Sequence, residues 1–304
     1  MQPRFYLDNS MWEKLACFDN TKKELFIQLS QPGIIKPIAS ETNFIELWGT
    51  HCYPSTIDIG NKVVDLMMRA MYRNPKILKS APALIIEDYE LGSRNRHTLK
   101  IYHPQSNIYF RKSINEFFRA AHGIGDSLKK IMALYAEYEK MNVSFLNICT
   151  QFITDIRQQY APKALRLQRK QVSNDPEDFL KELDRWPQRV ASAGAKNLGI
   201  TRRVRLDIPL SRMGLLGILA RANCYLLYNQ IKQNMNPQKG DANDMFHCIL
   251  GGIIGRFVTD EKQHKLPGMI RFAWKGNRNI KCYSYDSFIQ FLEQKRNEMS
   301  CPIS

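Results

Sequence analysis

The chain has 304 residues, and its 44% hydrophobic and 24% charged content is that of an ordinary globular protein. Lys and Arg outnumber Asp and Glu by 44 to 29, a formal net charge of +15 that favours a polyanionic partner, either nucleic acid or an anionic membrane surface. No run of about 18 apolar residues, no secretory signal and no CxxC pair among the 7 cysteines is visible, so we expect no membrane span, no zinc knuckle and no disulfide framework. These features predict a cytoplasmic protein with reduced thiols.

The first third of the sequence alternates between short apolar runs with strand character and amphipathic stretches with helical spacing. Capping residues precede the helical stretches, and a Pro-Gly pair interrupts the pattern before the second strand. In chain order we expect a strand at 4–7, helices at 10–18 and 22–29, a strand at 34–38, helices at 40–48 and 57–72, and a third apolar run at 83–86.

The middle of the chain changes to helical patterning, and strand character returns near its end. The expected elements are a helix at 115–160, a charged stretch at 162–205, a helix at 210–234, a loop at 236–240, a helix-strand-helix motif at 240–263, a strand at 269–274 and a helix at 285–298. Strand-helix alternation at both ends predicts an α/β fold whose parallel sheet, flanked by helices, is built from both chain ends. We divide the chain into a core of residues 1–90 and 236–304 and a basic, mainly helical insertion of residues 91–235.

Acidic residues follow predicted strands at both ends of the chain. Asp8 comes directly after the first strand, and Asp260 and Glu261 follow the apolar segment at 257–259. In an open parallel sheet, ligands bind outside the carboxyl ends of the strands, so carboxylates from distant parts of the chain are expected to meet there. A divalent metal held by such carboxylates indicates phosphodiester chemistry.

Further acids stand at predicted helices. Asp241 and Asp244 are three residues apart at a helix start, so they share one face beside the positive end of the helix dipole. Glu46 lies among apolar residues and is costly to bury without a partner. Converging carboxylates repel and raise one another's pKa values, whereas one or two Mg²⁺ or Mn²⁺ ions would relieve this and activate water. The predicted metal ligands are Asp8, Glu46, Asp241, Asp244, Asp260 and Glu261.

The acids also stand in four short motifs with a consistent order. These are Leu7-Asp8-Asn9-Ser10 at the end of the first strand, Glu46 within NFIELWG, Asn243-Asp244-Met245-Phe246-His247 at a helix start, and Val258-Thr259-Asp260-Glu261 after a strand. In order, local structure and chemistry the chain resembles the PIN-domain nucleases, the fold of bacterial toxin ribonucleases and a relative of flap endonucleases. The resemblance covers about the first 90 and last 65 residues, and it implies a PIN-like fold and a metal-dependent endonuclease.

The resemblance also implies the roles of individual residues and the nature of the substrate. It makes RNA a more probable substrate than DNA, although single-stranded or flapped DNA also fits the residues. Hydrogen bonds from Ser10 and Thr259 would orient the carboxylates, as groups behind metal ligands do. The catalytic residues that it implies are Asp8, Glu46, Asp244 and Asp260.

Four points depart from the family pattern or stay open. Compact family members place the Glu and the third acid much closer together than Glu46 and Asp244, which requires a large insertion here. The final acid usually stands two positions after the Thr, which selects Glu261, yet Asp260 fits equally well. Asp241 is either a second metal ligand or a helix cap. His247 either contacts a phosphate or is satisfied by its neighbours, and we prefer the second interpretation.

Clusters of basic residues in the predicted insertion favour nucleic-acid binding over a merely solvated face. Mixtures of cations and aromatic rings suit single strands, because Lys and Arg contact phosphates while rings stack on bases. The first cluster shares a face if its segment is helical. The clusters are Lys163, Arg166, Arg169 and Lys170; Arg202, Arg203 and Arg205; and Arg94, Arg96, Lys100, Tyr102, Tyr109, Phe110, Arg111 and Lys112.

The sequence therefore predicts a Mg²⁺- or Mn²⁺-dependent endonuclease that hydrolyses phosphodiester bonds, with RNA as the preferred substrate. One alternative is a non-catalytic nucleic-acid-binding protein with a degenerate nuclease fold, although an acid stands at every position that the family motif requires. Another is a nuclease effector held inactive by a protein inhibitor or a larger assembly. A membrane partner is not expected, because no strongly amphipathic Lys-rich helix stands out.

Overall fold

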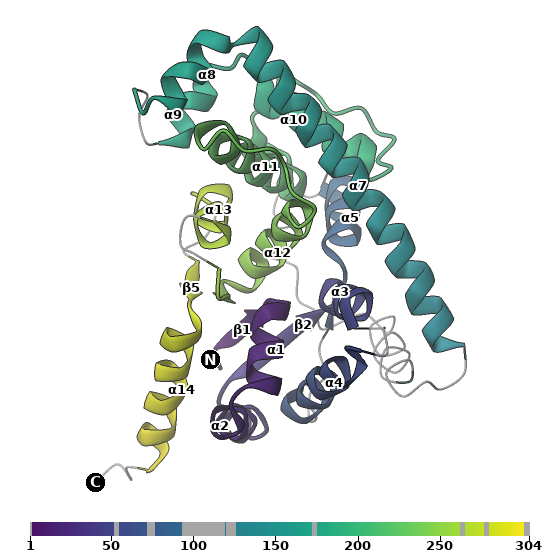
Figure 1. Ribbon diagram of the computed structural model, residues 1–304, viewed down its shortest axis with the longest axis vertical. Helices are drawn as coiled ribbons and strands as arrows, with labels where there is room; N and C mark the ends of the chain where they lie inside the picture. The colour runs from purple at the N-terminus through teal and green to yellow at the C-terminus, as the bar shows by residue number, and fades with distance from the viewer. Residues whose placement is uncertain are drawn as a thin grey trace.

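Five strands form the central sheet of the computed structural model, which describes residues 2–51, 55–71, 77–92, 119, 126–171, 175–261, 265–276 and 280–300. They lie in the order β3-β2-β1-β4-β5, and each neighbouring pair is parallel (Figure 1). The prediction of an α/β fold with a parallel sheet flanked by helices is confirmed. The strands are β1 (Arg4–Leu7), β2 (Lys36–Ser40), β3 (Ile77–Leu78), β4 (Arg256–Val258) and β5 (Lys281–Tyr283).

Helices connect these strands and account for most of the remaining described chain. The first part contains α1 (Asn9–Cys17), α2 (Asn20–Ser30), α3 (Glu41–His51), α4 (Ile57–Met71) and α5 (Ala81–Gly92). The second part contains α7 (Ser127–Gln159), α8 (Ala161–Gln168), α9 (Pro176–Lys181), α10 (Trp186–Asn197), η2 (Leu210–Arg212), α11 (Gly214–Lys232), α12 (Asp241–Ile254), α13 (Leu266–Ala273) and α14 (Tyr285–Ser300). Within the described ranges, no helix is long and apolar enough to cross a bilayer.

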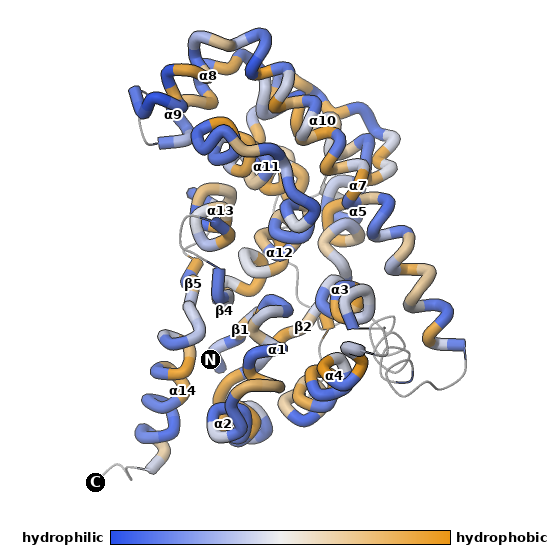
Figure 2. Tube along the Cα trace, in the orientation of Figure 1, coloured by the Kyte–Doolittle hydropathy of each residue, from blue (hydrophilic) through white to orange (hydrophobic). Residues whose placement is uncertain are grey.

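Alternate residues of β1 enter two different hydrophobic cores, because side chains along a strand point to opposite faces of the sheet. Phe5 and Leu7 pack on one face in a cluster that includes residues of α1, α2, α4 and α14. Tyr6 enters the other cluster, where residues of α5, α7, α11 and α12 cover the sheet. Figure 2 shows hydrophobic and hydrophilic residues alternating along the helices, as expected of helices with one buried face.

The helices of the predicted insertion share the second core with the sheet. Phe145 of α7 and Leu219 of α11 belong to the same buried cluster as Tyr6 of β1 and Phe246 of α12. The ring of Phe145 meets that of Phe246 edge-on, with 5.6 Å between their centroids. Helix α7 therefore packs directly on α12, and the division into a core and an insertion stays a prediction.

The strand order reverses at the centre of the sheet. The strands β2 and β3 lie on one side of β1, whereas β4 and β5 lie on the other. The backbone N–H of Asp8 still donates to the carbonyl of Val258, at 3.2 Å, so β1 and β4 end together. Such a reversal leaves a crevice outside the carboxyl ends of the two central strands, where open α/β sheets bind ligands.

Two predicted elements differ from the structure. The predicted strand at 269–274 is wrong, because this segment lies in α13 and its cap, with Met269, Ile270, Ala273 and Trp274 buried at helical spacing. The edge strand next to β4 is instead β5, in which Lys281 is exposed and the other two residues are only partly buried, so it carries little apolar signal. The apolar run at 83–86 lies within α5, and the third strand is the shorter β3. The predicted helix at 115–160 lies partly outside the described residues.

The glycines after Asp244 let α12 pack closely and end. A Cβ atom at Gly251 would lie 2.6 Å from Cδ2 of Phe257, and one at Gly252 would lie 2.0 Å from Cε2 of Trp274. Gly255 ends the helix with a φ of 83°, a left-handed conformation that favours glycine. These contacts fix α12, and hence its first turn, against the sheet.

Candidate functional site

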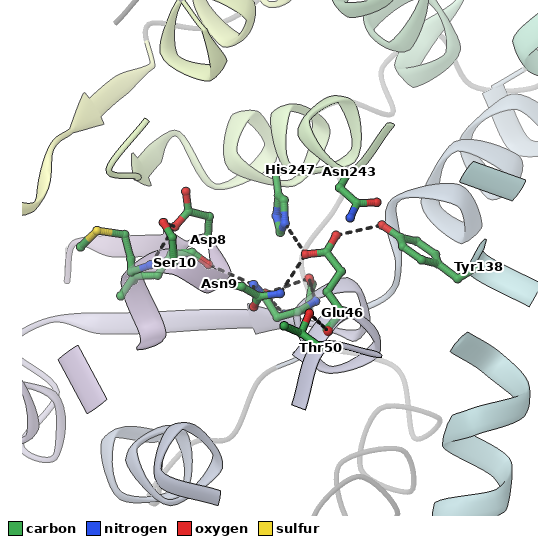
Figure 3. A network of polar contacts seen from close by, with 12 residues as sticks. Asp8, Asn9, Ser10, Glu46, Thr50, Tyr138, Asn243 and His247 are labelled. Carbon is green, nitrogen blue, oxygen red and sulfur yellow. Dashed lines mark hydrogen bonds and ion pairs between the residues drawn. The ribbon is translucent and has the colours of Figure 1, made fainter. Parts of the chain in front are cut away.

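Asp8 follows the last residue of β1, beside the end of the neighbouring strand β4. Its Oδ1 accepts hydrogen bonds from the backbone N–H of Met11 at 3.0 Å and from Oγ of Ser10 at 2.8 Å, so Asp8 caps α1 (Figure 3). Burial raises the pKa of Asp8, and a hydrogen bond from Thr259 opposes this rise. Ser10 and Thr259 thus both contact the carboxylate of Asp8.

Glu46, in the middle of α3, is the centre of a hydrogen-bond network. Its Oε2 accepts from Nδ2 of Asn9 at 2.8 Å and lies 2.9 Å from Nε2 of His247. Its Oε1 accepts from the hydroxyl of Tyr138, which reaches the site from α7, at 3.1 Å (Figure 3). Glu46 is therefore held by side chains from the start of α1, from α7 and from α12.

The network continues behind Glu46 and closes on itself. Nδ1 of His247 lies 2.8 Å from the hydroxyl of Tyr6, which lies 3.0 Å from Oγ of Ser40. Ser40 donates to Oδ1 of Asn43 at 2.9 Å, and Nδ2 of Asn43 donates to Oδ1 of Asn9 at 3.0 Å. Because Asn9 in turn contacts Glu46, the ring joins β1, β2, α3 and α12.

The directions of these hydrogen bonds determine where the protons lie. The Ser40 hydroxyl donates its only proton to Oδ1 of Asn43. The Tyr6 hydroxyl must therefore donate to Oγ of Ser40. The Tyr6 oxygen then accepts from Nδ1 of His247, while Nε2 of His247 faces the Glu46 carboxylate. His247 thus donates from both nitrogens, which is the imidazolium form.

The charges around His247 agree with this assignment. Burial disfavours the imidazolium, but the charge and hydrogen bond of Glu46, together with the charges of Asp8 and Asp244, raise the pKa of His247 to about 8. The ring is 4% exposed, so His247 is a buried cation within the acidic cluster. The interpretation of His247 as a residue satisfied by its neighbours agrees with these contacts.

Asp244 lies in the first turn of α12 and shows the repulsion expected of converging carboxylates. Burial and the nearby charges of Glu261, Asp241 and Glu46 raise its pKa to about 7, against the opposing charge of His247. The carboxylates of Asp8, Glu46, Asp244 and Glu261 therefore belong to one electrostatic cluster.

The structure separates the two acids that follow β4. Asp260 turns to Lys14 of α1, with 2.8 Å between its Oδ2 and Nζ of the lysine, and its side chain is 46% exposed. Glu261 lies 3.1 Å from Nζ of Lys265, and its backbone N–H donates to Oγ1 of Thr259. The charge of Asp244 also acts on Lys265, so the Glu261–Lys265 pair lies near Asp244.

Asp241 is engaged at the start of α12 rather than at the centre of the cluster. Its Oδ2 accepts from the backbone N–H of Gln238 at 2.6 Å and from Nε2 of Gln230 at 2.5 Å. These contacts close the loop before α12 and join it to α11. The sequence left open a cap or a metal ligand; these hydrogen bonds come from residues before the helix and are not an N-cap, since the N-cap residue is Gly240 and no side chain caps it.

The predicted nucleic-acid-binding residues lie away from the carboxylates or outside the described residues. Helix α8, which carries Lys163 and Arg166, lies at the end of the helical layer far from the sheet (Figure 1). Both side chains contact Glu182. Arg169 and Lys170 follow α8; Arg202, Arg203 and Arg205 are exposed before η2, and Arg205 pairs with Asp207 at 2.6 Å. The third cluster, Arg94, Arg96, Lys100, Tyr102, Tyr109, Phe110, Arg111 and Lys112, lies outside the described residues.

The donor chemistry of the cluster suits Mg²⁺ or Mn²⁺, which prefer carboxylate oxygens. Across the described parts of the chain, no group of three or more His, Cys, Asp or Glu side chains is arranged so that it could hold a metal ion.

No family model, curated protein or solved structure matches the chain. Function is therefore inferred from the geometry and the charges of this site.

Metal-free protein is expected to lose stability as the pH rises from about 5 to about 8. The pKa of Asp244 is raised from 3.8 to about 7 on folding, so its contribution to stability is fully present below pH 3.8 and is lost as the pH rises through 7. His247 acts in the same sense between 6.5 and about 8. Melting temperatures measured in EDTA across this range test the prediction, and a melting temperature that rises with pH would contradict it.

Proposed function

We propose that the chain is a metal-dependent endonuclease with a PIN-like core that hydrolyses phosphodiester bonds in RNA. The observation that carries this proposal is the meeting of Asp8, Glu46, Asp244 and Glu261 at the reversal point of a parallel sheet, although they come from both ends of the chain. The four sequence motifs that resemble PIN-domain nucleases supply these same acids. The substrate class rests on that resemblance and on the net charge of +15.

Asp8, Asp244, Glu261 and Glu46 would hold the ion. A carboxylate offers about four acceptor positions, and Glu46 uses three of them for Asn9, His247 and Tyr138. One position on Oε1 remains for an ion. Since Mg²⁺ binds few protein carboxylates and keeps several waters, it would need only some of these oxygens.

A bound Mg²⁺ or Mn²⁺ ion would supply the activation of water and the neutralisation of charge at the scissile phosphate. The protein residues prepare for this. Met11 and Ser10 fix Oδ1 of Asp8, and Asn9 and His247 fix Oε2 of Glu46. His247 also adds a fixed positive charge, which limits the repulsion among the carboxylates before a substrate binds.

Substitution of the two acids after β4 is expected to have unequal effects. Glu261→Gln should reduce cleavage about 10-fold to 100-fold, because a charge of the cluster is lost. Asp260→Asn should leave cleavage within about 2-fold, because Asp260 pairs with Lys14 at an exposed position. Steady-state cleavage rates of the two variants at equal Mn²⁺ concentration measure the difference. A larger loss in Asp260→Asn would assign the ligand to Asp260 instead.

The proposal is tested by incubating end-labelled single-stranded RNA and DNA with the protein in Mg²⁺, Mn²⁺ or EDTA. Wild-type protein is expected to cut internally in both metals and not in EDTA, with RNA cut faster, and Asp8→Asn is expected to be inactive. Tight, salt-sensitive binding without cutting in any metal would favour a non-catalytic nucleic-acid-binding protein. Activity that appears only after a co-purifying protein is removed would favour a partner-inhibited effector.

A further inference from the structure

The corner at which α1 ends and α2 begins carries the most exposed large hydrophobic residue of the described chain. Phe18, the C-cap of α1, is 79% exposed. Its backbone keeps the helical conformation, and its N–H donates to the carbonyl of Lys14 at 3.2 Å. Residues four apart share one face of a helix, so Phe18 follows Lys14 one turn further along the same face. The corner therefore presents an aromatic ring to solvent beside a lysine.

Two lysines of this corner converge on the ring of Tyr285 at the start of α14. The Nζ atoms of Lys14 and Lys22 lie 4.3 Å and 5.4 Å from the ring centroid, within the range of a cation–π contact. Each lysine also pairs with an acid, Lys14 with Asp260 at 2.8 Å and Lys22 with Asp19 at 3.0 Å. Both side chains are still 36% exposed, and an ammonium has three donors. Each lysine can therefore donate to a ligand oxygen as well.

Two further lysines lie close to Phe18. Burial raises the pKa of the neighbouring Cys17 thiol, and the charges of Lys62 and Lys23 oppose this rise. The corner thus combines an exposed ring with several cations. Single-stranded nucleic acids are bound by this mixture, because Lys contacts phosphates while an aromatic ring stacks on a base. A membrane surface would instead require a bulky apolar face.

The corner is also adjacent to the carboxylate cluster. Phe18 lies about 15 Å along α1 from Asp8, the N-cap of the same helix. Between them, Lys14 pairs with Asp260, which directly follows Thr259, a hydrogen-bond partner of Asp8. A strand bound at the carboxylates could therefore continue onto Lys14 and Phe18.

We propose that this corner binds single-stranded nucleic acid, with the Phe18 ring stacked on a base and with Lys14 and Lys22 in contact with neighbouring phosphates. The inference deepens the proposed function and rests on it for the choice of nucleic acid as the ligand. It places substrate contacts on α1 and α2 rather than on the basic clusters of the predicted insertion. Binding at this corner requires no metal ion.

The test measures binding of labelled single-stranded RNA by fluorescence anisotropy in EDTA, which prevents metal-dependent cleavage. Phe18→Ala is expected to weaken binding about 5-fold to 150-fold, the range for loss of stacking on one base. Phe18→Trp should restore the affinity, because it keeps an aromatic ring. The matched control is Leu165→Ala on α8, since Leu165 is 49% exposed and stands between Lys163 and Arg166 in the sequence. This control should leave the affinity within about 2-fold.

Heparin, a polyanion without bases, separates stacking from charge. Phe18→Ala should bind heparin as wild type does, whereas the double variant Lys14→Gln with Lys22→Gln should bind both RNA and heparin more weakly. For RNA, the slope of log affinity against log salt should become shallower by about 1.4 in the double variant, because each phosphate contact on a single strand contributes about 0.7.

RNA binding that is unchanged in Phe18→Ala would overturn the inference, and so would equal losses for RNA and heparin in that variant. An equal loss of RNA affinity in Leu165→Ala, or wild-type protein that binds no single-stranded RNA, would overturn it too. Failure of the proposed function gives a different result. The protein would then bind RNA in EDTA with the expected losses in the variants, but it would not cut RNA in Mn²⁺ or Mg²⁺.

Discussion

Asp244→Asn is expected to remove metal-dependent cleavage and, at the same time, to stabilise the metal-free protein. Asp244 is kept ionised at pH 8 against burial and three neighbouring acids, and a pKa of about 7 in place of 3.8 corresponds to roughly 4 kcal/mol of destabilisation. Asparagine removes this charge but leaves a buried polar group, so we expect a gain on the order of 2 kcal/mol. Loss of a metal ligand should lower the cleavage rate about 1000-fold.

Urea unfolding in EDTA at about pH 8 and cleavage rates in Mn²⁺ measure these opposite effects. Asp241→Asn is the matched control, because Asp241 stands in the same helical turn but accepts hydrogen bonds from Gln230 and Gln238. It should keep cleavage activity and lose about 1 kcal/mol of stability, because its two hydrogen bonds are weakened. A destabilised but active Asp244→Asn would show that Asp244 is a structural residue.

Glu46→Leu is expected to cause the largest loss of stability among substitutions at the site. The change leaves the buried imidazolium of His247 without its carboxylate partner, and removal of one member of a buried ion pair costs about 3–5 kcal/mol. Asn9 and Tyr138 lose their acceptor as well. The effect should shrink as the pH rises through about 8, because His247 then loses its proton in the wild-type protein too.

Urea unfolding at about pH 7 and about pH 9 measures the effect of Glu46→Leu and its pH dependence. Glu24→Leu is the control, because Glu24 pairs with Arg69 at the surface with its side chain 46% exposed, and such pairs contribute about 0–1 kcal/mol. Equal losses in the two variants, or a loss that does not change with pH, would contradict the assignment of a buried Glu46–His247 ion pair.

The sequence was most informative where a strand ends and a helix begins. Asp8 follows an apolar strand, and Asp244 stands in the first turn of a helix with buried Met245 and Phe246, so their local structure could be read from hydrophobic spacing. The parallel sheet followed from strand-helix alternation. Asp8 and the acids after β4 could be expected near each other because carboxyl ends of parallel strands share one edge.

The partners of these acids could not be predicted, because they depend on tertiary packing. Tyr138 has no signal that separates it from the other aromatic residues of a long helix, and only the packing of α7 on α3 brings it to Glu46. The relay from His247 through Tyr6 and Ser40 crosses three elements. Short edge strands such as β5 are equally hard to predict, since pairing with β4 rather than apolar content defines them.

The choice between Asp260 and Glu261 shows the same limit at the level of two neighbouring residues. Motif spacing favours Glu261. The local sequence does not distinguish the two residues, because both are acids that follow a strand. In the structure the two acids have different partners: Asp260 pairs with Lys14 of α1, and Glu261 pairs with Lys265 beside α13. The direction of a side chain after a strand depends on residues that are distant in sequence.

The central claim is that the carboxylates at the reversal point of the sheet bind the ion that cuts the substrate. The most direct measurement is a Mn²⁺ titration at about pH 8, followed by electron paramagnetic resonance, of wild-type protein and the double variant Asp8→Asn with Asp244→Asn. We predict saturable binding of one or two ions by wild-type protein and none by the variant. Absence of saturable binding in wild-type protein, or equal binding by both proteins, would contradict the proposed metal site.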